Sequence, residues 1–171
     1  MANVSVTEYP PYYQPYVQLV GFQDLLKCLE NSITELLQYC SRLNNQQALF
    51  RYQAGKWSIK EIIQHLIDVE RIFCYRALSI SRGDTALNSF DHNKYVIHCN
   101  ADYRQLNDLL KEIEILRKST IILYKSFNVP MLQQRGFIEN NSITVNAFGF
   151  IIAGHQLHHT KIIKNKYLHA L

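Results

Sequence analysis

The chain has 171 residues, of which 47% are hydrophobic and 19% are charged, so it can bury a core and is not intrinsically disordered. A formal net charge of +4 is too small for a strongly basic nucleic-acid binder, and we expect no nucleic-acid partner. Six glycines and four prolines argue against an all-β fold with many tight turns, and the length predicts one domain over residues 1–171.

The N-terminal region is predicted to be an extended arm over residues 1–15, because it carries three prolines and no helical pattern. Its tyrosines are expected to pack on the domain surface and to take no part in chemistry. From about Val17 to Leu43, apolar residues recur in steps of three and four, which predicts the first helix. Residues 44–56 are polar and form a connection.

The second helix has the clearest start signal. The Ser58 hydroxyl can cap the helix, and the Glu61 carboxylate can reach back to the Ser58 amide, which together form a capping box. The pattern continues to about Ser81 and stops at the sequence Arg82-Gly83-Asp84. Residues 83–99 show no clear period and predict a long ordered crossover.

Two further helices complete the predicted fold. The third covers about Ala101 to Phe127, and the fourth runs from Thr144, a plausible cap, to Leu168. No segment is predicted to be a strand. The sequence therefore predicts an all-α protein, a four-helix bundle with a long crossover between helices 2 and 3.

The cysteines and the first residues indicate the cellular setting. No two cysteines form a C-x-x-C pair, which favours reduced thiols over a zinc ribbon or a disulfide framework. The first twenty residues lack the basic start and apolar run of a signal peptide, and no apolar stretch is long enough to span a membrane. We expect a cytoplasmic protein without a membrane partner.

The fourth helix carries a cluster of histidines. At about 100° per residue, His155 and His159 lie about 40° apart in the middle of the apolar stripe, and His158 lies at its edge. Two inward imidazoles one turn apart can bind a metal ion together. Hydrogen-bonded core histidines are the alternative, and His158 is an alternative ligand.

A third ligand could come from the second helix. His65 lies at the shoulder of its apolar face and can reach a neighbouring helix. A set of His65, His155 and His159 would leave one tetrahedral position open, as in catalytic zinc sites. Zinc is the expected divalent ion, with nickel, iron or manganese as alternatives. The remaining histidines are expected at the surface or in loops: His92, His98 and His169.

Two carboxylates of the second helix need an interpretation. Glu70 falls about 140° from His65, on the apolar side of the helix. We predict a structural ion pair with Arg104 or Arg117, because buried carboxylates need partners, and keep a general base at the metal as the alternative. Asp68 is predicted to be a solvated surface carboxylate, with hydrogen bonding to a ligand histidine as its alternative.

The second and fourth helices resemble those of a known family. The stretch from Lys56 to Glu70 (KWSIKEIIQHLIDVE) and the sequence GHQLHH at 154–159 resemble the signatures of the DinB/YfiT-like superfamily. Residues 71–84 and the crossover sequence FDHN at 90–93 are similar too, so the resemblance covers nearly the whole chain. It implies a four-helix bundle and a metal held by His65, His155 and His159.

The resemblance also implies a class of activity. The family includes transferases that use bacillithiol or mycothiol and a mycothiol-dependent maleylpyruvate isomerase, alongside proteins described as metal-dependent hydrolases. A metal-dependent enzyme is therefore expected, acting on a small-molecule substrate and activating a low-molecular-weight thiol or water. The family further implies a homodimer. The alternative is a non-catalytic, stress-associated bundle that binds a metal or a small ligand.

Overall fold

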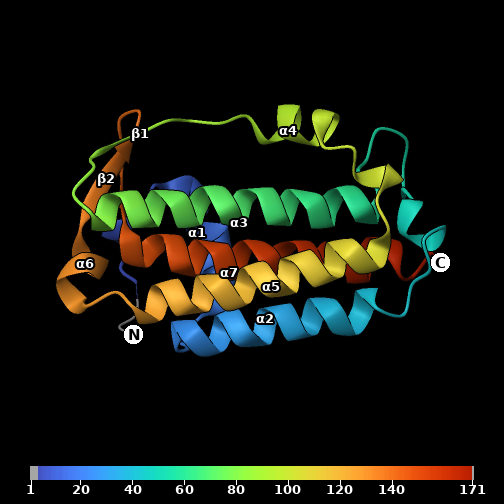
Figure 1. Ribbon diagram of the computed structural model, residues 1–171, viewed down its shortest axis with the longest axis horizontal. Coiled ribbons are helices and arrows are strands. Elements are labelled where there is room, and N and C mark those ends of the chain that lie inside the picture. Colours follow the sequence, from blue (N-terminus) through green and yellow to red (C-terminus); the bar gives the residue numbers. More distant parts are fainter. Residues whose placement is uncertain (1–3, 171) are drawn as a thin grey trace.

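Four long helices run side by side through the computed structural model, which describes residues 4–170 (Figure 1). They are α2 (Leu25–Cys40), α3 (Ile59–Ser81), α5 (Leu106–Lys125) and α7 (Val145–Ile162), and α7 continues into a π-helical turn at Ile163–Tyr167. Thr144 caps α7 as predicted, its hydroxyl accepting from the Ala147 amide. The predicted four-helix bundle is confirmed.

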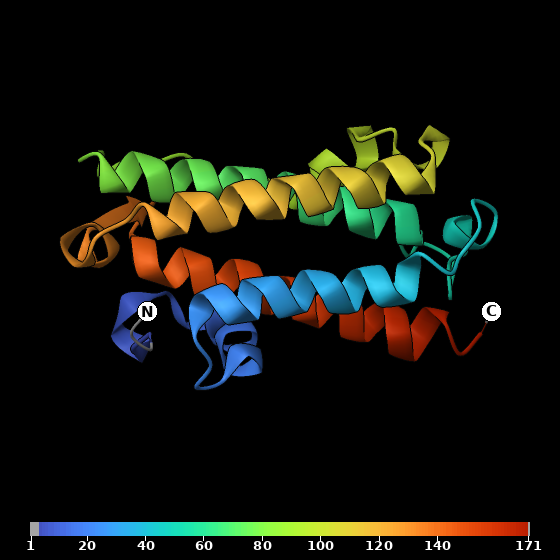
Figure 2. The ribbon, with the colours of Figure 1, turned by 60° about the horizontal axis from the view of Figure 1, so that its bottom comes forward.

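The order of the helices around the bundle explains the long crossover. Helix α3 contacts α5 and α7, and α2 contacts the same two helices. The colours in Figure 1 show that α3 and α5 run in the same direction, and Figure 2 shows these two helices in one layer above α2 and α7. Because neighbouring helices α3 and α5 are parallel, residues 82–105 must return along the length of the bundle. The predicted crossover is confirmed.

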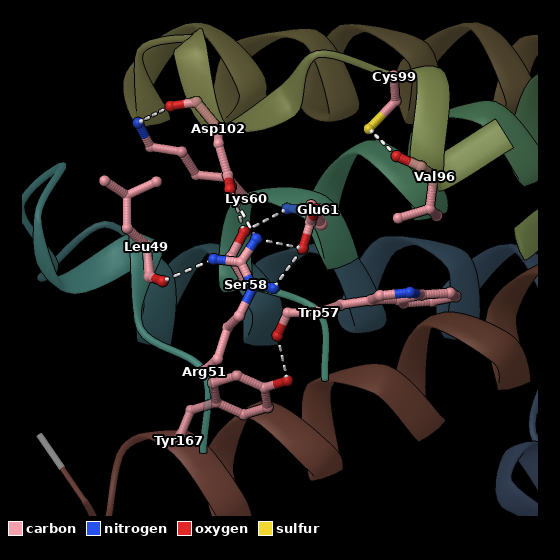
Figure 3. A network of polar contacts seen from close by, with 10 residues as sticks. All are labelled: Leu49, Arg51, Trp57, Ser58, Lys60, Glu61, Val96, Cys99, Asp102 and Tyr167. Atoms are coloured by element: carbon pink, nitrogen blue, oxygen red, sulfur yellow. Dashed lines mark hydrogen bonds and ion pairs between the residues drawn. The ribbon is translucent and has the colours of Figure 1, made fainter. Parts of the chain in front are cut away.

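The capping box predicted at the start of α3 is present (Figure 3). Ser58 Oγ accepts from the Glu61 amide at 3.0 Å, and Glu61 Oε2 accepts from the Ser58 amide at 2.7 Å. The Asp102 carboxylate, from the end of the crossover, accepts the Ser58 hydroxyl at 2.6 Å and forms an ion pair with Arg51 at 2.7 Å. The crossover is thereby fastened to the first turn of α3.

The N-terminal region differs from the prediction. Instead of an extended arm, it forms 3-10 turns at Val6–Glu8 and Pro11–Tyr13 and then helix α1 (Gln14–Val20). Prolines fit in the first turn of a helix, where their missing N–H is not needed, so they start helices here. The predicted helix from Val17 to Leu43 is split, because Gly21 adopts a positive φ of 63° between α1 and α2.

The connections also contain elements that were not predicted. The crossover includes β1 (Ala86–Leu87) and α4 (His92–His98), and the segment before α7 includes α6 (Val129–Gln133), β2 (Arg135–Ile138) and β3 (Asn141–Thr144). Strand β1 pairs in parallel with β2, and β2 pairs antiparallel with β3. The expectation of no strands is therefore wrong, although the sheet is small. Strands of two to four residues are too short to show an alternating pattern.

Apolar side chains form two clusters along the inside of the bundle. The four cysteines carry free thiols, as predicted. Within residues 4–170, no helix combines the length and hydrophobicity that crossing a bilayer requires.

Candidate metal centre

Three histidine side chains from two helices converge on one point. His65 Nε2 lies 3.1 Å from His155 Nε2, and His159 Nε2 also lies 3.1 Å from His155 Nε2. One ring nitrogen from each of the three lies within 4.8 Å of the others. The structure therefore brings together the residues that the sequence singled out as ligands.

These imidazoles are neutral at pH 7. The exposed fractions of His65, His155 and His159 are 5%, 8% and 8%. Burial lowers the pKa of His65 to about 3, and the nearby His92 adds to the effect. Burial also holds the pKa of His155 and His159 well below the usual range, with further lowering from the neighbouring imidazoles. Each ring thus keeps an unprotonated nitrogen able to bind a cation.

The arrangement fits a divalent ion better than it fits hydrogen bonds among the rings. Each imidazole nitrogen offers either one N–H or one lone pair in the ring plane. His155 Nε2 has two nitrogen neighbours at 3.1 Å and can form a good hydrogen bond with only one of them. Two nitrogens bound to one tetrahedral zinc at 2.0–2.1 Å would lie about 3.3–3.4 Å apart. The two spacings of 3.1 Å are close to that value, and the third pair lies within 4.8 Å.

Local sequence explains how the helices place these rings. His155 and His159 lie one turn apart on α7, and His65 faces them from α3, which packs against α7. Gly154 lets α1 approach α7 closely, because a Cβ there would lie 1.9 Å from the Tyr16 carbonyl oxygen. The Tyr16 ring then meets His155 edge to face, with centroids 5.2 Å apart.

Two aromatic residues from the connections stand against the histidines. The Trp57 ring lies 4.8 Å from that of His65 and stacks on that of His159 at 6.4 Å. Its carbonyl accepts from the Tyr167 hydroxyl at 2.7 Å (Figure 3). His92 is exposed, as predicted, but its ring lies 5.7 Å from that of His65. His92 therefore belongs to the surroundings of the centre, which its loop-like sequence did not indicate.

The histidines open into a cavity of about 550 Å³ between α3, α7, α1 and the crossover. Tyr12, Tyr13 and Tyr16 line it, so the expectation that the N-terminal tyrosines only pack on the surface is wrong. Arg76 of α3 also lines it. Arg76 follows His65 by eleven residues, close to three helical turns, so helical spacing could have placed it on the same face.

The other predicted residues lie outside the cluster. The buried Glu70 forms the predicted ion pair with Arg117 at 2.8 Å, not with Arg104, and so points away from the histidines. Asp68 is half-buried and accepts from Gln64 at 2.9 Å, which supports neither a free surface carboxylate nor a hydrogen bond to a ligand histidine. His158 lines the cavity outside the convergent set. The side chains of His98 and His169 are exposed, as predicted.

Comparisons with known proteins bear on the family and the fold. Residues 29–163 match the DinB superfamily. A protein of Oceanobacillus iheyensis is 23% identical to this chain over 86% of each chain. That protein is named as a proposed metal-dependent hydrolase.

Two solved structures share the fold. YfiT from Bacillus subtilis, described as having an unusual four-helix bundle topology, matches with a TM-score of 0.73 at 18% identity over 82% of each chain. A mycothiol-dependent maleylpyruvate isomerase matches with a TM-score of 0.67 at 9% identity, over 80% of this chain and 58% of that one. At these identities the likeness establishes the bundle topology alone.

Proposed function

The chain belongs to the DinB superfamily, and we propose that it is a metal-dependent enzyme whose divalent ion is held by His65, His155 and His159. The observation that supports this most strongly is the convergence of three buried ring nitrogens, two of them 3.1 Å from the third. Zinc is the proposed ion because it readily takes three imidazoles in tetrahedral sites, with nickel, iron or manganese as alternatives.

The proposed reaction is transfer of a low-molecular-weight thiol to a small electrophile. A divalent ion supplies Lewis acidity, which lowers the pKa of a coordinated thiol or water. Three neutral histidines would leave the charge of such an ion uncompensated, so an anionic form of the thiol or of water would be favoured beside it. The adjoining cavity of about 550 Å³ is within the range that takes small organic ligands.

The protein side chains supply position and shielding. His65 lies about two turns into α3, whose first turn is fixed by the capping box, and His155 and His159 are placed by the packing of α7 against α1 and α3. The Trp57 ring packs against His65 and the Tyr16 ring against His155, and both contacts would limit the access of water to these imidazoles. These contacts would keep the open position directed into the cavity.

Hydrolysis is the second candidate. The carboxylate of Glu139, at the turn between β2 and β3, lines the same cavity and could accept a proton from water. The name of the Oceanobacillus protein also proposes hydrolysis. We rank it second because Glu139 is exposed rather than fixed beside the histidines.

Metal content of untagged protein tests the ligand set. We expect about one equivalent of zinc in the wild-type protein and in His158→Asn, whose side chain lies on the same helix outside the cluster. His155→Asn should lose the ion, because His155 is the central member of the set. Equal zinc in wild type and His155→Asn, or loss of zinc from His158→Asn alone, would contradict the proposal.

The reaction type is tested on the zinc-loaded protein with a model electrophile. Thiol transfer predicts that consumption of the electrophile depends on an added thiol and falls to background in His155→Asn. Hydrolysis predicts turnover of an ester or amide without thiol that decreases in Glu139→Gln. A thiol-independent rate for every electrophile would remove the transferase assignment.

A further inference from the structure

Arg76 is a buried arginine without an acidic partner. Only 4% of its surface is exposed, and one of its terminal nitrogens donates to the Asn88 carbonyl. Its guanidinium lies 5.7 Å from the Phe73 ring centroid and 5.2 Å from that of Phe90. No ion pair joins it to a carboxylate anywhere in residues 4–170, whereas the buried Arg117 has Glu70 as its counter-ion.

Within residues 4–170, the positive charge of Arg76 is therefore not balanced by a carboxylate. Burial lowers the pKa of Arg76, and the groups that oppose this lowering are tyrosines rather than carboxylates. Glu139 lines the same cavity but is exposed, and it forms no ion pair with Arg76 in the described chain. Buried charges are strongly disfavoured unless they are paired, so the site is suited to an anion.

Helical geometry places the Arg76 side chain on the same face of α3 as His65, a ligand of the candidate metal centre. Eleven residues separate His65 and Arg76 on α3, which corresponds to a rotation of about 20° and a rise of about 16 Å. The Arg76 side chain leans back toward His65, because Cα–Cβ bonds point to the helix N-terminus. Val69 and Phe73 of α3 line the cavity between them, and Ile151 lines it from α7. The cavity therefore has three histidines at one end, an apolar middle and a guanidinium at the other end.

We propose that Arg76 binds the carboxylate of an elongated ligand, substrate or thiol cofactor, whose reacting end lies at the three histidines. The assignment of the reacting end rests on the proposed function; the carboxylate site does not. The guanidinium fork can pair at two points with a carboxylate or with a phosphate. A carboxylate fits better because Arg76 is the one Lys or Arg among the lining residues of the described cavity, and this single positive charge matches one negative charge rather than the nearly two of a phosphate monoester. The anionic group would lie about 10–15 Å from the histidines.

Octanoate and octan-1-ol are matched probes for this site, because they share an apolar chain and differ in charge. Binding can be followed by the fluorescence of Trp57, the single tryptophan of the chain, which lines the same cavity. In metal-free protein we expect octanoate to bind at least tenfold more tightly than octan-1-ol. Arg76→Met should abolish this preference, while Arg71→Gln, which removes an exposed charge from the same helix, should retain it.

The folding of each variant is checked by circular dichroism. If Arg76→Met is misfolded, Arg76→Gln replaces it, since its amide can still donate to the Asn88 carbonyl. Equal affinities of the two probes for wild-type protein, or an octanoate preference that survives loss of the guanidinium, would overturn the proposal. Octyl phosphate binding more tightly than octanoate would overturn the assignment to a carboxylate.

A second measurement separates this inference from the proposed function. An ω-mercapto acid should bind zinc-loaded protein at least tenfold more tightly than metal-free protein. Arg76→Met should weaken the binding of this acid to both forms of the protein by a similar factor. If zinc gives no gain while octanoate still requires Arg76, the thiol role fails and the carboxylate site stands. If zinc gives the gain but Arg76→Met has no effect, the carboxylate site fails and the metal role stands.

Discussion

Replacing Arg117 with methionine tests the polar network at the centre of the bundle. The Arg117 side chain is 1% exposed and pairs at two points with Glu70, with Nε–Oε1 and Nη2–Oε2 distances of 2.8 Å. Its other terminal nitrogen donates to the Leu29 carbonyl at 2.8 Å and to Ser32 Oγ at 2.7 Å. Arg117 Nη2 also donates to Gln156 Oε1, so this one side chain joins all four long helices.

The expected loss is large because the partner is left behind. Arg117→Met keeps Glu70, which is 3% exposed, as a buried carboxylate with Thr120 as its remaining donor. Removing one partner of a buried ion pair costs about 3–5 kcal/mol. For a chain of this size that corresponds to a fall in Tm of about 6–20 °C. Lys118→Met, one residue further along α5, breaks an exposed i,i+4 pair and should cost about 0.5 kcal/mol or less.

Urea denaturation followed by circular dichroism measures both variants. The difference between Arg117→Met and Lys118→Met in free energy of unfolding is the quantity that matters, since the two changes lie on one helix. A loss below about 1 kcal/mol for Arg117→Met would refute the reasoning that this network holds the helices together.

Three further results are expected. Gly154→Ala should lower the free energy of unfolding by about 1–3 kcal/mol, because its Cβ would meet the Tyr16 backbone; an unchanged urea midpoint would contradict this. Ser58→Ala should cost about 1–2 kcal/mol by the same assay, because it removes the cap of α3 and the bond to Asp102, and a neutral effect would argue against the capping box. The metal-free protein should lose stability as the pH falls below about 6.5. Below this pH the three histidines become protonated in the unfolded chain, whereas burial keeps them neutral in the folded chain. The slope of the free energy of unfolding against pH, at most about 1.4 kcal/mol per pH unit for each histidine, should decrease in His65→Asn. An identical slope in wild type and variant would show that His65 is not held neutral.

Local patterns predicted the elements that carry the histidines. The capping box at Ser58 fixed the start of α3, and the i,i+4 spacing of His155 and His159 placed both on one face of α7. Glu70 was correctly expected to be buried and paired, because its position on the helix left no access to water. These features depend on residues within a few turns of one another, which is the range over which sequence patterns are informative.

The cavity wall could not be predicted, because it depends on contacts between distant segments. Tyr16 reaches His155 only because Gly21 ends α1 and Gly154 lets α1 approach α7. His92 reaches His65 only because the crossover returns along the bundle. Gly21 and the Asp24 cap are sequence signals that could have split the predicted first helix, which rested on the apolar spacing alone.

The central claim is that three imidazoles share one ion, and anomalous diffraction from crystals of the zinc-loaded protein tests it most directly. The account predicts a single strong anomalous peak at the zinc edge, about 2.0–2.1 Å from Nε2 of His65, His155 and His159, with a further position open to the cavity. A peak bound by fewer than three of these nitrogens, or zinc bound only elsewhere on the chain, would contradict it.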